Sequence, residues 1–191
     1  MIELIPPPLP LLLQLLLIVL VLPAAVFDFR SRRIPNWLCV AGFVAGVGAN
    51  TVLGGWAGLK ASLLGFAVAF GVYFVLYLLH AMGAGDVKLM GAAGAITGLH
   101  TWLVLFAATS IFGMIAALAL ALAKGRFGAT LWNVAYLVRE LLSFRAPYMR
   151  HEQLDVKNPK TLRLPHGVSI AAGAAAVLIL AWWKAAGRQG N

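Results

Sequence analysis

The sequence has few charged residues and a single cysteine. Of its 191 residues, 11% are charged and 62% are hydrophobic, whereas a soluble domain is about one quarter charged. This composition excludes a water-soluble enzyme, a disordered protein and a nucleic-acid-binding domain. The lone Cys39 excludes an internal disulfide and a zinc site built from several thiolates. We therefore expect one membrane domain that covers residues 1–191.

Long apolar runs fill most of the chain. A helix needs about 20 apolar residues to cross a bilayer, and runs near this length predict an all-α integral membrane protein with six transmembrane helices. The predicted spans are 9–27, 37–54, 59–80, 86–100, 102–123 and 167–186. The fourth span is short and rich in glycine and alanine, so we expect it to pack in the centre of the bundle.

The net charge of +9 has an uneven distribution along the chain. With the N-terminus outside, 12 of the 15 Lys and Arg residues fall in inner segments, and Lys60, Lys184 and Arg188 fall outside. This is the positive-inside asymmetry of membrane proteins, and it explains the charge without a nucleic acid. Within the basic inner loop at about 124–166, apolar residues recur at helical spacing from Phe127 to Leu141, which predicts an amphipathic helix on the inner membrane surface.

Two of the six acidic residues, Asp28 and Asp86, lie at the ends of predicted spans. Between them the chain crosses outward and back, so both carboxylates are expected at the inner face. An ionisable group at membrane depth is costly and indicates a functional site. The other interpretation is local ion pairing, of Asp28 with an arginine in segment 30–33 and of Asp86 with Lys88.

A facing pair of aspartates has the chemistry of metal-free peptide hydrolysis. Such a pair shares a proton, so that one carboxylate activates water and the other carboxyl group protonates the substrate. Asp28 is expected at the C-terminal end of a helix and Asp86 at the N-terminal start of another. The helix dipole then favours Asp28 as the acid and Asp86 as the base.

Short motifs surround both aspartates. Gly83 and Gly85 precede Asp86, and we expect them to give the backbone conformations closed to other residues and to let a substrate strand approach. Lys88 is the cation beside this motif.

After Asp28, the tripeptide Ile34-Pro35-Asn36 predicts an extended turn whose asparagine caps the second span. A third element, 164–173, opens the last span.

These elements resemble a known family. Gly83-Ala84-Gly85-Asp86 is similar to the GxGD signature of the type IV prepilin peptidases, and the Asp28 and 164–173 elements resemble two further motifs of that family. The resemblance implies a membrane aspartic endopeptidase that removes the basic leader from prepilins and pseudopilins at the cytoplasmic face of the bacterial inner membrane. It implies that Asp28 and Asp86 are the catalytic pair and that Gly83 and Gly85 shape the second site. Prepilins of this family commonly carry a glutamate shortly after the cleaved bond, and we expect Lys88 to meet this acidic group.

The chain is most similar to the short peptidases that accompany tight-adherence pili. Larger members carry an extra segment with paired CxxC motifs and methylate the new N-terminus. Here about ten residues separate the first two spans, and there is one cysteine. We therefore expect no such zinc-binding segment, no N-methyltransferase activity and no metal or other cofactor. His166 occupies a position where this subgroup is expected to have an aromatic residue.

Two other functions are consistent with the sequence. A non-enzymatic carrier or assembly scaffold could use the aspartates to bind an ion or a proton, although a carrier needs polar groups near the membrane midplane. A GxGD protease could instead cleave other membrane segments, but the element 164–173 argues against this. The expected partners are prepilin or pseudopilin substrates and membrane lipids, with no nucleic acid.

Overall fold

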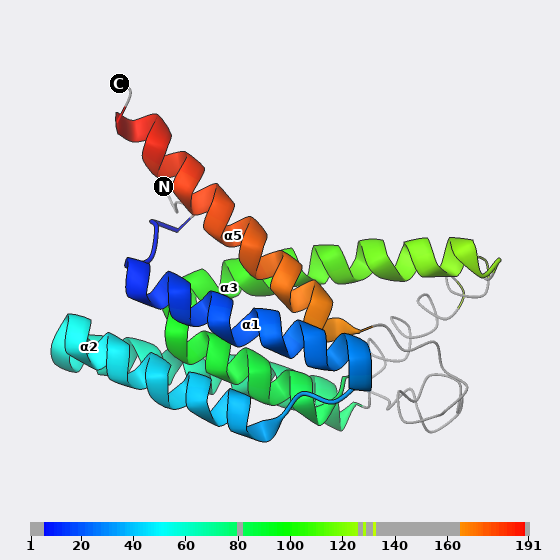
Figure 1. The fold of residues 1–191 in the computed structure, drawn as a ribbon, viewed down its shortest axis with the longest axis horizontal. Coiled ribbons are helices and arrows are strands. Elements are labelled where there is room, and N and C mark those ends of the chain that lie inside the picture. The colour runs from blue at the N-terminus through cyan, green and yellow to red at the C-terminus, as the bar shows by residue number, and fades with distance from the viewer. Residues whose placement is uncertain (1–5, 80–81, 126–127, 129–131, 133–164, 190–191) are drawn as a thin grey trace.

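Every described element of the protein is an α-helix, which confirms the predicted all-α fold (Figure 1). The computed structural model describes residues 6–79, 82–125, 128, 132 and 165–189. The helices are α1 (Leu11–Ser31), α2 (Asn36–Leu78), α3 (Ala84–Ala123) and α5 (His166–Gln189). All four are long and apolar enough to cross a membrane.

The described residues form four helices, so the predicted count of six is not supported. The second and third predicted spans are joined at a kink within α2, and the fourth and fifth at a kink within α3. Instead of a loop, each of these helices contains one kink. The kink in α2 is at Gly55 (φ 56°, ψ −137°), and the kink in α3 is at Gly98 (φ 70°, ψ 171°). Both φ values are positive, which glycine adopts at little cost because it lacks a Cβ.

The two halves of α2 lie on either side of the same part of α3. The Asn50 side chain, before the kink, donates hydrogen bonds to the carbonyl oxygens of Ala95 and Ile96, each at 3.0 Å. The Ser62 hydroxyl, after the kink, donates to the Ala95 oxygen at 2.6 Å. Helix α2 therefore doubles back at Gly55 (Figure 1).

The first half of α3 lies at the centre of the bundle, as predicted from its small residues. Every residue from Leu89 to Thr97 is buried. Gly65 of α2 and Gly94 of α3 allow the two backbones to touch, because a Cβ on either glycine would overlap the carbonyl oxygen of the other. This close approach is the known role of small residues between membrane helices.

Helix α1 extends further than predicted and continues through Pro23. Its C-cap is Arg32, which has left-handed backbone angles (φ 54°, ψ 29°) and donates its main-chain N–H to the main-chain carbonyl oxygen of Asp28 at 2.9 Å. Asp28 therefore lies inside the last turn of α1. Most of the segment 124–166 lies outside the described residues, so its amphipathic helix stays a prediction.

Candidate active site

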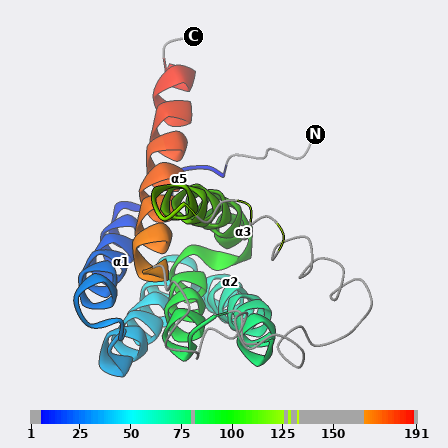
Figure 2. The ribbon, with the colours of Figure 1, turned by 90° about the vertical axis from the view of Figure 1, so that its right-hand side faces the viewer.

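Asp28 contacts the first turn of α5. Its side chain is buried, and its Oδ2 accepts a hydrogen bond from the Gly167 N–H at 2.7 Å. The first amides of a helix have no partner within the helix, and this carboxylate satisfies one of them. Gly167 also allows the approach, because a Cβ there would lie 3.0 Å from the Asp28 Cβ. Helices α1 and α5 lie side by side at this point (Figure 2).

Asp86 occupies the first turn of α3 and is half-buried. Its Oδ2 accepts the N–H of Gly83, the residue before the helix, at 3.2 Å. This bond is the returning half of a capping box. The Asp28 and Asp86 carboxylates lie within electrostatic range of each other. The structure thus brings together the two aspartates that the sequence singled out.

The expected assignment of Asp28 as the acid and Asp86 as the base stays a prediction. It rested on Asp28 lying at a C-terminal helix end and Asp86 at an N-terminal one. In the structure both carboxylates accept an amide at the start of a helix, Asp28 from Gly167 of α5 and Asp86 from Gly83 before α3. The end of α1 and the start of α5 therefore act on the Asp28 carboxylate with dipoles of opposite effect.

The two glycines before Asp86 act differently from the expectation. Within the described residues, the glycines with positive φ are Gly55, Gly98 and Gly125, so Gly83 and Gly85 do not provide an unusual backbone conformation. Gly85 provides space instead. A Cβ there would lie 3.2 Å from the Ile34 Cβ. The space expected to admit a substrate strand is occupied by Ile34 of the same chain.

Lys88 and Asn36 contact each other. The exposed Lys88 Nζ donates a hydrogen bond to the Asn36 Oδ1 at 2.8 Å. Asn36 does not cap α2 as predicted, because Pro35 occupies the N-cap position and Asn36 is the first helical residue. Its side chain is therefore available for the start of α3. This bond joins the motif around Asp86 to the tripeptide after Asp28.

Two aromatic rings lie beside the aspartates, and sequence reasoning gave neither a role in the site. The His166 ring packs against the Tyr73 ring with centroids 6.2 Å apart. His166 lies within electrostatic range of Asp28 and Tyr73 within range of Asp86. The sequence signal that could have indicated a place for His166 in the site was its position in the element 164–173, directly before Gly167. Among the described residues, no group of three His, Cys, Asp or Glu side chains could hold a metal ion.

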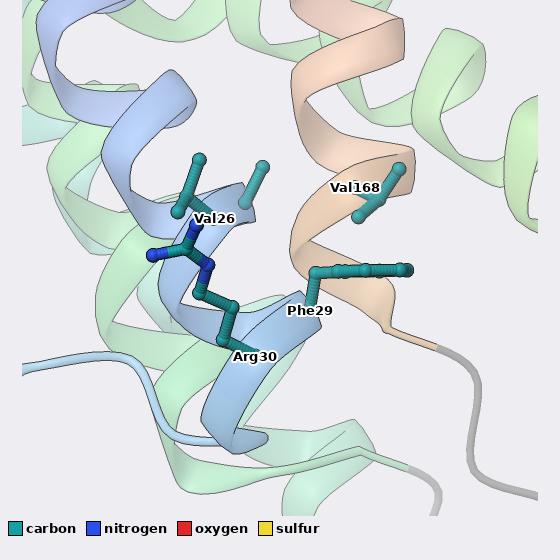
Figure 3. Close-up of a pocket in the computed structure, with 5 residues that line it drawn as sticks. Val26, Phe29, Arg30 and Val168 are labelled. Atoms are coloured by element: carbon teal, nitrogen blue, oxygen red, sulfur yellow. The ribbon is translucent and has the colours of Figure 1, made fainter.

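An apolar groove of about 380 Å³ lies near this site but opens elsewhere. It is lined by Ala25, Val26, Phe29, Arg30 and Val168 (Figure 3). At 100° per residue, the positions two before and two after Asp28 lie roughly 160° from it around the helix. Neither Asp28 nor Asp86 is among the residues that line this groove.

One comparison with known proteins gives a match. Residues 15–118 match the type IV leader peptidase family. Neither the curated proteins nor the solved structures gave a match. The matched stretch covers more than half of the chain and includes both Asp28 and Asp86, whose motifs first indicated this relationship. The chain belongs to the type IV leader peptidase family.

Proposed function

We propose that this protein is an aspartic endopeptidase that removes the leader peptide from type IV prepilins or pseudopilins, with Asp28 and Asp86 as its catalytic pair. One observation carries the proposal. The only two carboxylates among the described residues come from different helices and lie within electrostatic range of each other. Grouping two ionisable side chains at the end of membrane helices is costly and is typical of a functional site.

The pair would hydrolyse the peptide bond by moving protons. The ionised carboxylate takes a proton from water as the water oxygen attacks the scissile carbonyl, while the protonated partner gives its proton to the carbonyl oxygen. The tetrahedral intermediate then collapses. The first carboxyl group protonates the leaving amine, and the second takes back the hydroxyl proton. The Gly83 and Gly167 amides hold the two carboxylates in orientation during both steps.

We place this site at the cytoplasmic face of the bacterial inner membrane, with the N-terminus outside. The distribution of Lys and Arg supports this orientation through the positive-inside rule. A leader peptide that is basic and remains in the cytoplasm would meet the carboxylates at that face. Close packing between small residues of the helices would keep the two aspartates at the same depth in the membrane.

The carrier alternative has less support. A transport path needs polar groups that are free to bind an ion inside the spans. The side chains of Asn50, Ser62 and Thr97 are polar and central, but each donates to main-chain carbonyl oxygens near the α3 kink. These groups stabilise an interrupted helix, whereas the two carboxylates lie at helix ends, in the last turn of α1 and the first turn of α3.

The proposal is tested by co-expression with candidate prepilins and a gel shift that reports leader removal. Asp28→Asn and Asp86→Asn should each reduce cleavage by several orders of magnitude, because residues that act as one catalytic unit fail together. Both variants should still insert into the membrane. Glu152→Gln, which neutralises a carboxylate of the predicted basic loop, is the matched control and should cleave normally. Near-normal cleavage by either aspartate variant would contradict the proposal.

A further inference from the structure

We propose that Lys88 and Asn36 form a positioning pair, which fixes Asp86 relative to Asp28, and that Lys88 does not act by binding the substrate through its charge. The inference rests on the proposed function, because it assigns a role within the same site. Its basis is the 2.8 Å hydrogen bond from the Lys88 Nζ to the Asn36 Oδ1. This bond joins the first turn of α3 to the first residue of α2.

The bond is one of two contacts that flank Asp86 in the sequence. On one side Gly85 packs against Ile34, with 3.2 Å between the Ile34 Cβ and the position of a Gly85 Cβ. On the other side Lys88 binds Asn36. Ile34 lies in the short connection between α1 and α2, and Asn36 directly follows this connection. The first turn of α3 is therefore fastened directly to the end of the helix that carries Asp28.

The two contacts restrain different movements. The Ile34–Gly85 contact is apolar and limits how closely the connection approaches α3, whereas a hydrogen bond also fixes direction. A charged donor makes that bond shorter and stronger than a neutral one. Together they hold the start of α3 against both sliding and rotation. Because a shift of about 1 Å at reacting groups costs on the order of 100-fold in rate, small restraints of this kind matter.

Both Lys88 and Asn36 are exposed. An exposed polar pair contributes little to overall stability, so its loss should lower the rate of cleavage without unfolding the protein. A Lys88 that bound an acidic substrate group would behave differently, because Asn36 would compete with the substrate for the ammonium group. The two interpretations therefore make opposite predictions for Asn36.

The experiment compares Asn36→Leu with Lys88→Met in the full chain. For each variant, kcat and KM are measured with a prepilin that the wild-type protein cleaves, and thermal unfolding is measured on the variant itself. Each substitution removes one side of the hydrogen bond while keeping the approximate side-chain size. We expect each to lower kcat about ten-fold, with KM changed less than about two-fold and the unfolding temperature unchanged. The double variant should be no slower than either single variant, because both break the same bond.

Two further variants complete the test. Asn36→Asp keeps an acceptor for Lys88 and should retain wild-type kcat. Arg33→Met removes a neighbouring exposed cation and should also cleave normally.

The inference is overturned if Asn36→Leu retains activity while Lys88→Met raises KM, since Lys88 would then bind substrate. It is also overturned if neither variant lowers kcat. These results differ from a failure of the proposed function, in which Asp86→Asn itself would still cleave.

Discussion

The start and the kink of α3 both leave backbone groups without partners inside the helix, and the protein satisfies them in different ways. At the kink, the carbonyl oxygens of Ala95 and Ile96 receive hydrogen bonds from the neutral side chains of Asn50 and Ser62. At the start, the Gly83 amide meets the Asp86 carboxylate. A helix has unsatisfied amides at its N-terminal end and unsatisfied carbonyls at its C-terminal end. The amide at the start of α3 therefore meets an acceptor side chain, and the carbonyls before the kink meet donor side chains.

This difference separates a stabilising region from the proposed active site. Asn50 and Ser62 use their donors fully on the backbone of the kink. A carboxylate has two oxygens, and the amide bonds to Asp86 and Asp28 involve only Oδ2 of each. Further acceptor capacity remains at the site. Substitutions at the kink should therefore change stability, and substitutions at the site should change the rate of cleavage.

The largest effect is expected for Gly65→Ala at the kink. A Cβ there would overlap the Gly94 oxygen and lie 2.9 Å from the Gly98 Cα. Overpacking against backbone cannot be relieved by a rotamer change, so we expect destabilisation of at least about 3 kcal/mol and loss of folded protein. Size-exclusion chromatography and thermal unfolding in detergent measure this. The control Gly71→Ala adds a Cβ with nothing within 4 Å and should fold normally.

Gly167→Ala should have the next largest effect, and it should act on the rate. The new Cβ would lie 3.0 Å from the Asp28 Cβ and 3.1 Å from its Oδ2, so the carboxylate must move. We expect kcat to fall about ten-fold or more, with the unfolding temperature nearly unchanged. Gly187→Ala, on the same helix with nothing within 4 Å, is the control. Equal kcat for both variants would show that the Gly167 contact does not orient Asp28.

Asn50→Leu should lower stability without changing kcat. It removes an NH2 group whose two hydrogens are shared among the main-chain oxygens of Gly46, Ala95 and Ile96, each 3.0 Å from Nδ2. We expect a loss of about 2 kcal/mol, because a membrane offers these carbonyl groups few other donors. Thr51→Val removes a bond within its own helix only and should cost much less. A large fall in kcat for correctly folded Asn50→Leu would break the separation between the two regions.

Ser62→Ala should give the smallest effect. It removes one 2.6 Å hydrogen bond to the Ala95 oxygen, for an expected loss of about 1 kcal/mol. Asn50 donates to the same oxygen, so the two substitutions should be non-additive in the double variant. Ser110→Ala, whose hydroxyl bonds Phe106 of its own helix, is the control. Strict additivity would mean that the two donors stabilise the kink independently.

Sequence patterns predicted the parts of this molecule that depend on composition and on local motifs. Apolar runs gave the all-α fold, and the small residues of the fourth predicted span indicated its central, buried position. The placement of Asp28 and Asp86 together followed from topology and motif resemblance. Each of these conclusions required only the composition of one segment, or the number of times the chain crosses the membrane between two residues.

The errors concern geometry that depends on distant residues. A glycine at a predicted loop does not reveal whether the chain forms a loop or a single kinked residue, as at Gly55. The space at Gly85 is filled by Ile34, and the Asn36 side chain binds Lys88 instead of capping its own helix. The partner of Asp28, the Gly167 amide, lies far away in the sequence. Only the packed structure shows which of these groups meet.

The contact between Asp28 and Gly167 has a consequence for biosynthesis. Asp28 belongs to the first helix of the chain and Gly167 to α5, the last described one. During translation both aspartates enter the membrane well before the amide that holds Asp28 has been made. A nascent chain that stops before His166 contains the complete pair of carboxylates but lacks one of their supports. Completion of the proposed site is thereby coupled to the synthesis of α5, because Asp28 has no amide from Gly167 before that helix is made.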